Sequence, residues 1–178
     1  MAWSTTPWSA KNGLGFGLLA GVVFAVVQCL TSWIAGDGAL RPVRYAASEV
    51  LGARALSESS LALVLVVGLG LHFAFCAFLG LAYSLIDSRL SLELRTSVAH
   101  HAAVGMLFGI GVWVLTFQFM GRGYFPWFLE VPQFGQMVLH AVFFGAPLGL
   151  LFAAAERRRL ASAAFEQRSL EERAGSEP

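Results

Sequence analysis

Four long stretches of this 178-residue chain contain no Asp, Glu, Lys or Arg, and this feature restricts the possible folds more than any other. A helix needs about 20 mainly apolar residues to cross the hydrocarbon core of a bilayer. Each stretch meets that requirement, so we predict four membrane-spanning α-helices. The predicted spans run from Leu14 to Ile34, from Leu61 to Ile86, from Ser97 to Met120 and from Phe134 to Ala155.

Composition supports a membrane environment for these stretches. Hydrophobic residues make up 57% of the chain and charged residues 13%, about half the charged share of soluble domains. A soluble domain of this length cannot bury so much apolar surface in one core. We therefore predict an all-α integral membrane bundle of four transmembrane helices in residues 1–160. Residues 161–178 are predicted to form a charged cytoplasmic tail that extends the last helix and then becomes disordered. The net charge of +1 predicts no nucleic-acid partner, and the lipid bilayer is the expected partner.

The positions of Lys and Arg predict the orientation of the spans. Cytoplasmic loops carry an excess of these residues. We predict that both termini are cytoplasmic, because eight of the twelve Lys and Arg residues then fall on the inner side. We also predict that the first span is retained and is not a cleaved secretion signal. The inner group is Lys11, Arg89, Arg95, Arg157, Arg158, Arg159, Arg168 and Arg173, and the outer group is Arg41, Arg44, Arg54 and Arg122.

The two outer connections have patterns of their own. Pro42 suits the first turn of a helix, and the apolar residues of RPVRYAASEVLG fall on one helical face. We predict a short helix in the outer interface, after which Ser59 or Ser60 caps the second span. The other connection is rich in aromatic residues, which anchor at the headgroup level of membranes. The aromatic residues assigned to this belt are Trp3, Trp8, Trp33, Tyr124, Trp127 and Phe128.

Small residues recur every four positions in each predicted span. Residues four apart share one face of a helix, and a glycine-lined face lets two helix backbones approach closely. Within lipid, such contact is a main source of helix association. We predict a tightly packed bundle, with the alternative that one or more faces contact another copy or a partner membrane protein. The glycines assigned to helix packing are Gly17, Gly21, Gly68, Gly80, Gly105, Gly109, Gly145 and Gly149.

A histidine lies on the small-residue face of the second span, within the uncharged run GLGLHFAFCAFLGLAYS. His72 therefore points toward a neighbouring helix, where it can donate a hydrogen bond to a backbone carbonyl or to Gln28. The alternative is a haem b held between His72 and His140. Counting 1.5 Å per residue puts His72 roughly 16 Å and His140 roughly 9 Å below the outer surface, an awkward difference for two axial ligands. His100 and His101 are expected at the inner end, partly solvated.

Signatures of other chemistry are missing from the sequence. Cys29 and Cys76 lie in apolar runs without CxxC spacing, and we interpret them as small buried hydrophobic residues. Gly13, Gly15 and Gly17 resemble part of a dinucleotide fingerprint, but they follow no strand and precede an apolar helix. Apart from histidine, the spans hold none of the ionisable groups that proton relays require. We predict no metal site, no cofactor apart from the haem alternative, and no enzymatic activity.

Several segments together resemble a known family. They are GLLAGVVFAVVQCLTSW, RPVRYAASEVLG, EVPQFGQMVLHAVFFG and the closing Arg157–Arg159 triplet, together with His72, Tyr83 and the Met120-Gly121 pair. In layout and composition they resemble the YagU-like proteins, a bacterial inner-membrane family of about four spans with poorly defined chemistry. The resemblance covers residues 13–159. It implies a multi-pass protein of the bacterial inner membrane and implies no catalytic residue.

Three functions fit these observations. The first is a non-enzymatic inner-membrane protein that packs by its small-residue faces, as a self-associating bundle or as an accessory subunit of a larger membrane complex. The second is a haem-b-binding electron-transfer subunit that uses His72 and His140. The third is a small transporter of a neutral or lipidic solute, which the aromatic outer connections permit.

Overall fold

The computed structural model describes residues 10–175, and within that range every element of regular structure is helical. Two π-helical segments continue or join the α-helices, and two short 3₁₀ turns lie in the connections. The α-helices are α1 (Ala10–Ile34), α2 (Arg41–Leu51), α3 (Leu61–Asp87), α4 (Leu92–Thr96), α5 (Val98–Trp113), α6 (Gln133–Leu139) and α7 (Ala146–Gly175); the π segments are Val114–Gly121 and His140–Gly145, and the 3₁₀ turns are Ala53–Leu56 and Pro126–Glu130.

Four continuous helices are long and apolar enough to cross a membrane, as the sequence predicts. They are α1, α3, α5 with its π segment, and the unit made by α6, the second π segment and α7. The last helix continues to Gly175, so it includes most of the tail that we predicted as a helical extension of the last span. Residues 161–178 include four Ala, four Glu and two Arg, and all three residue types have high helix propensity. Residues 176–178 lie outside the described residues, as do Trp3 and Trp8.

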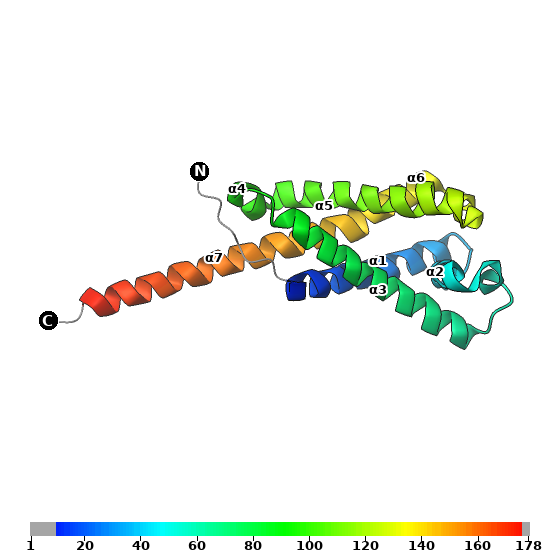
Figure 1. Ribbon diagram of the computed structural model, residues 1–178, viewed down its shortest axis with the longest axis horizontal. Helices are drawn as coiled ribbons and strands as arrows, with labels where there is room; N and C mark the ends of the chain where they lie inside the picture. Colours follow the sequence, from blue (N-terminus) through cyan, green and yellow to red (C-terminus); the bar gives the residue numbers. More distant parts are fainter. Residues whose placement is uncertain (1–9, 176–178) are drawn as a thin grey trace.

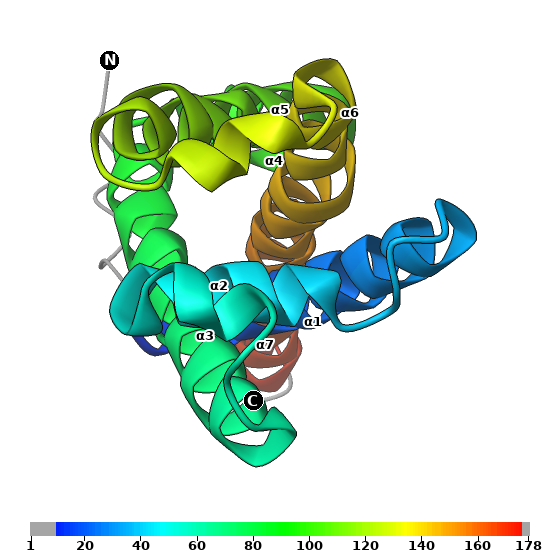
Figure 2. The ribbon, with the colours of Figure 1, turned by 90° about the vertical axis from the view of Figure 1, so that its right-hand side faces the viewer.

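The long helices form two antiparallel hairpins. In the first hairpin α1 packs along α3, and in the second α5 packs along the second π segment and α7. Both long connections lie at one end of the molecule with α2 and α6, here called the α2 end (Figure 1). The opposite end holds α4, and α7 projects beyond it (Figure 1). Helix α2 lies across its end of the bundle and packs against α3 (Figure 2).

Glycine contacts bring the helices of each hairpin close together. A Cβ atom at Gly17 would overlap the carbonyl oxygen of Cys76 and would lie 2.9 Å from the Cα of Gly80. A Cβ atom at Gly105 would overlap the carbonyl oxygen of Gly145 in the same way. The eight glycines assigned to packing all lie at such contacts, although the partner of Gly68 is α2 and not another long helix. The small-residue faces are therefore used inside the chain.

Two connections lie at the α2 end. The first folds as the sequence predicts, and the second folds differently. Pro42 lies in the first turn of α2, and Ser60 caps α3 by accepting a hydrogen bond from the Leu63 amide. The second connection does not simply present its aromatic residues to the surface. Phe128 is only 3% exposed, and the indole Nε1 of Trp127 donates to the Ser48 hydroxyl at 2.8 Å. These two aromatic side chains therefore fasten the second connection onto α2.

Candidate functional site

A cavity of about 320 Å³ lies between the two hairpins in the half of the molecule nearest α2. Its lining reaches from Asp37 and Arg41, near the start of α2, to Cys76 and Leu79 deep in α3. This volume lies at the lower end of the range for small-molecule sites. Both hairpins contribute polar side chains to walls that are otherwise apolar and aromatic. The polar side chains deep in the cavity are Gln28, His72, Thr116, Gln136 and His140.

His72 bridges the helices of the first hairpin. Its Nε2 atom lies 3.0 Å from the carbonyl oxygen of Gly21 on α1, so the imidazole donates its N–H to the backbone of the facing helix. Gly21 makes this approach possible, because a Cβ atom there would lie only 2.7 Å from the Cys76 sulfur. The sequence predicts this interhelical hydrogen bond, and the acceptor is the backbone carbonyl and not Gln28.

His140 lies in the second π segment and is almost fully buried. Its Nδ1 atom donates to the carbonyl oxygen of Gln136, one turn earlier in the same helix, at 2.7 Å. His72 and His140 line the same cavity, although the sequence places them at different depths. Helix α3 runs obliquely through the bundle (Figure 1), so its residues descend less steeply than in an upright helix. The ring of Phe24 contacts both imidazoles, with centroid separations of 6.2 Å and 4.5 Å.

The two hairpins share one contact register, in which His72 and His140 occupy equivalent places. Going toward the α2 end, each pair of helices meets at successive small residues and then at a histidine. The first hairpin pairs Gly13 with Gly80, Gly17 with Cys76 and Gly80, and Gly21 with Cys76 and His72; the second pairs His101 with Gly149, Gly105 with Gly145 and Gly149, and Gly109 with His140 and Ala141. His140 lies five residues before Gly145, whereas His72 lies four before Cys76. The π segment accommodates that extra residue.

Two glutamine side chains connect the hairpins within the cavity. The Nε2 of Gln28 on α1 donates to the Oε1 of Gln136 on α6 at 2.7 Å, and the reverse contact is 3.4 Å. Nearby in the lining, the hydroxyl of Thr116 is buried and has no hydrogen-bond partner among residues 10–175. Thr116 belongs to the first π segment, so both π segments contribute to the cavity wall. Such segments occur frequently at functional sites.

Helix α2 contributes a carboxylate to the lining of the cavity, at the end of the cavity nearest the protein surface. Glu49 lines the cavity, and burial raises the pKa of its carboxyl from 4.5 to about 7. Burial has this effect because a low-dielectric environment disfavours the charged form. Arg41, at the start of the same helix, is paired with Asp37 and lies over the ring of Tyr45. The carboxyl of Glu49 is therefore the cavity group that titrates near neutral pH outside the long helices.

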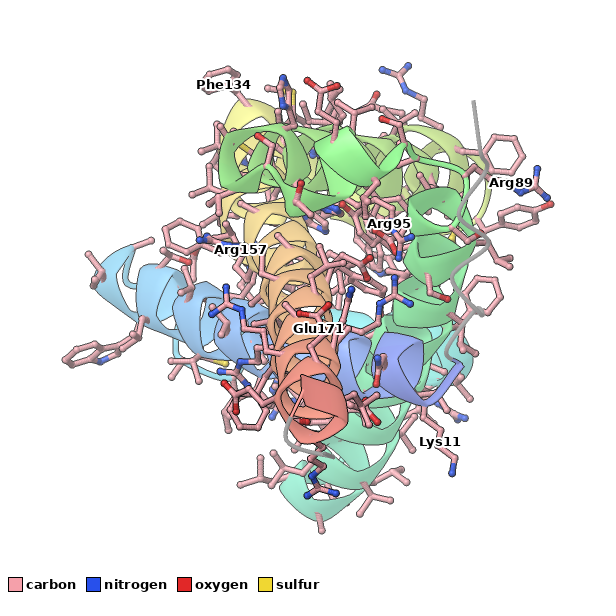
Figure 3. The ribbon with its side chains drawn as sticks, turned by 90° about the vertical axis from the view of Figure 1, so that its left-hand side faces the viewer. Lys11, Arg89, Arg95, Phe134, Arg157 and Glu171 are labelled. Atoms are coloured by element: carbon pink, nitrogen blue, oxygen red, sulfur yellow. The ribbon has the colours of Figure 1, made fainter. Side chains whose placement is uncertain are left out.

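A second polar cluster, absent from our sequence predictions, lies at the α4 end. Arg95 is 5% exposed and contacts Glu156 at 3.1 Å and Asp87 at 3.4 Å. Figure 3 shows Arg95 inside the end of the bundle, whereas Arg89 and Lys11 point away from it. The available sequence signal was that Asp87 and Glu156 each directly follow a predicted span. Sequence alone does not show that these side chains turn inward.

His101 belongs to the same cluster, and its expected partial solvation is wrong. The imidazole is fully buried, with Nδ1 3.3 Å from the Tyr83 hydroxyl and Nε2 3.3 Å from Asp87. The prediction failed because it assumed that a histidine at the start of a span meets the interface. Here α4 and the ion pairs of Arg95 cover it. His100, its neighbour, is exposed as expected.

In the described part of the chain, no group of three or more His, Cys, Asp or Glu side chains is arranged to hold a metal ion. Both cysteines are free thiols. The chain matches no protein-family model, no curated protein and no solved structure in the comparisons made. Similarity to the YagU-like family and haem binding by His72 and His140 both stay predictions.

Proposed function

We propose that this chain is a four-span protein of the bacterial cytoplasmic membrane that binds a small neutral or lipidic solute in the cavity between its hairpins. Membrane insertion is supported by the four apolar helices and by their outward-facing side chains. Val66 and Phe134 are each 74% exposed, and Leu107 is 68% exposed. Apolar surface on this scale is costly in water but favourable against lipid tails.

The proposed orientation places the α4 end in the cytoplasm and the α2 end outside. The Arg157–Arg159 triplet and Arg89 lie toward the α4 end, whereas Arg41, Arg44 and Arg54 lie toward the α2 end. Since eight of the twelve Lys and Arg residues belong to the α4 side, the positive-inside rule favours this direction. The cavity then faces the outer half of the membrane, and the buried ion pairs of Arg95 close the cytoplasmic half.

The observation that carries the binding proposal is the polarity of the cavity. Contacts between the hairpins elsewhere are close-packed and aromatic, as at Tyr83, Leu148 and Phe152. In the cavity, by contrast, two histidines and two glutamines from both hairpins converge around empty space. Burying a polar side chain within a membrane costs free energy, and polar side chains at such positions mark functional sites. A neutral solute matches the deep polar side chains, which are histidines, glutamines and a threonine, whereas Asp37, Arg41 and Glu49 belong to the part of the lining contributed by α2 and its approach.

The accessory-subunit hypothesis receives less support from this arrangement. It relied on glycine-lined faces that are available to another protein. Each of the eight glycines instead faces another helix of the same chain. Packing within the chain therefore accounts for the glycine spacing. The cavity is the feature that this packing does not account for.

The test is binding of small neutral probes to protein reconstituted in nanodiscs. Ala25 lines the cavity, so Ala25→Phe should fill it. The matched control is Val26→Phe, because the neighbouring side chain is 52% exposed on the outer surface. We expect 4-propylphenol or 1-fluoro-4-propylbenzene to bind at one molecule per chain by calorimetry, after subtraction of empty nanodiscs. Binding should disappear in Ala25→Phe and persist in Val26→Phe; equal binding in both variants, or none in wild type, would contradict the proposal.

A further inference from the structure

The two imidazoles in the cavity have their hydrogen positions fixed by the backbone. Neither His72 nor His140 forms an ion pair with a described residue, and an unpaired charge in apolar surroundings is costly. Each ring is therefore neutral and carries one N–H. A carbonyl oxygen can only accept, so that hydrogen lies on the nitrogen that contacts the carbonyl.

This assignment leaves one hydrogen-bond acceptor on each ring. In His72 the Nε2 hydrogen is donated to Gly21, so Nδ1 carries the lone pair. In His140 the Nδ1 hydrogen is donated to Gln136, so Nε2 carries the lone pair. The lone-pair nitrogen of a neutral imidazole accepts hydrogen bonds and cannot donate them. The equivalent histidines of the two hairpins thus offer the cavity a pair of acceptors.

The remaining surroundings suit a flat apolar ligand with a hydroxyl group. Aromatic rings of Phe24, Phe117 and Phe144 line the same cavity. The amides of Gln28 and Gln136 bond to each other, and each retains a second hydrogen as a donor. A hydroxyl oxygen can therefore accept from an amide while its hydrogen is donated to an imidazole. A ketone, ether or quinone has no hydrogen to donate and leaves both imidazoles unsatisfied.

We propose that the cavity selects hydroxylated aromatic molecules, of the phenol or hydroquinone class, by accepting their O–H hydrogen on His140 or His72. This inference rests on the proposed binding function and specifies its ligand class. It assigns His140 and His72 the role of recognition residues. These two residues discriminate against molecules of the same shape that lack an O–H donor.

The test compares two probes of nearly equal shape, 4-propylphenol and 1-fluoro-4-propylbenzene, in wild type and in His140→Leu. The quantity measured is the ratio of the two dissociation constants. Dividing the wild-type ratio by the variant ratio cancels differences in lipid partitioning. We expect the phenol to be favoured about threefold to tenfold more in wild type than in His140→Leu. His140→Gln places an amide oxygen near the position of Nε2, and should restore the preference.

A second measurement avoids the risk that a His140 variant fails to fold. In wild-type protein labelled with ¹⁵N-histidine, 4-propylphenol should move the NMR resonance of an unprotonated imidazole nitrogen, whereas 1-fluoro-4-propylbenzene should not. An unchanged ratio in His140→Leu, or equal NMR responses to the two probes, would overturn the ligand class. Binding that Ala25→Phe abolishes would in that case leave the proposed function standing. Failure of both probes to bind wild type would instead overturn the proposed function.

Discussion

Replacing Gly105 by alanine tests whether close backbone contact holds the second hairpin together. The new Cβ atom would overlap the carbonyl oxygen of Gly145 and would lie 2.9 Å from its carbonyl carbon and 3.1 Å from the Gly149 amide nitrogen. All three are backbone atoms of the facing helix, so no side chain can move aside and the helices must separate. Overpacking of this kind costs up to about 3 kcal/mol. Alanine regains about 1 kcal/mol of helix propensity over glycine, which leaves a net loss of about 2 kcal/mol.

The matched control is Gly111→Ala on the same continuous helix. A Cβ atom at Gly111 meets nothing within 4 Å, so only the propensity gain of up to about 1 kcal/mol applies. Thermal unfolding in mild detergent should show Gly105→Ala about 4–8 °C below wild type and Gly111→Ala at or slightly above it. Equal Tm values for the two variants would refute the reasoning, because they would show that α5 and α7 are not in backbone contact at Gly105.

The remaining predictions concern charge and capping. Arg95→Leu should lower the free energy of unfolding by about 3 kcal/mol, because Asp87 and Glu156 lose the buried cation that they share and Glu156 keeps only its contact with the more exposed Arg159. The exposed Arg157→Leu should change it by less than about 0.5 kcal/mol, as measured by denaturant titration. The raised pKa of Glu49 means that the folded protein binds the extra proton between pH 4.5 and about 7, so stability should fall as the pH rises through this window; Tm measured against pH should lose this slope in Glu49→Gln. Ser60→Ala removes the cap of α3 and should cost about 1 kcal/mol by the same titration, a cost that Ser57→Ala should not produce.

Much of the architecture could be predicted from the sequence, because the relevant signals are local. Helix length and the lack of charge identify the four long helices, and Pro42 with an apolar face identifies α2. The spacing of four residues puts His72 on the face of α3 that meets a neighbouring helix, so an interhelical hydrogen bond follows from the pattern. The pattern does not identify Gly21 or choose between a backbone carbonyl and Gln28 as the acceptor. Local patterns succeed where a helix presents one regular face to one neighbour.

The features that could not be predicted depend on irregular backbone or on several helices at once. The π segment at His140 shifts the helical register by one residue, and no composition cue precedes it. His72 and His140 line one cavity although their positions in the sequence imply different depths, and neither the π segment nor the tilt of α3 can be read from the sequence. The cluster around Arg95 requires α3, α4 and α7 to meet, and only tertiary structure shows that. Phe128 resembles a membrane anchor in sequence, but packs under α2 instead.

The central claim is that two hairpins cross the membrane with both long connections on one side. Labelling of single cysteines by a membrane-impermeant maleimide tests it directly. Cys29 and Cys76 are first replaced by alanine, so that the chain carries no other thiol. Each reporter cysteine is then placed at an exposed position, and labelling in intact cells is compared with labelling after lysis.

Four reporters cover the two ends of the molecule. Ser57→Cys and Glu130→Cys lie in the two connections at the α2 end, whereas Arg89→Cys and Ser162→Cys lie at the α4 end. We predict that the first two react in intact cells and that the last two react only after lysis. Labelling of Ser57→Cys and Glu130→Cys on opposite sides of the membrane, or of Arg89→Cys together with either of them, would contradict the four-crossing arrangement.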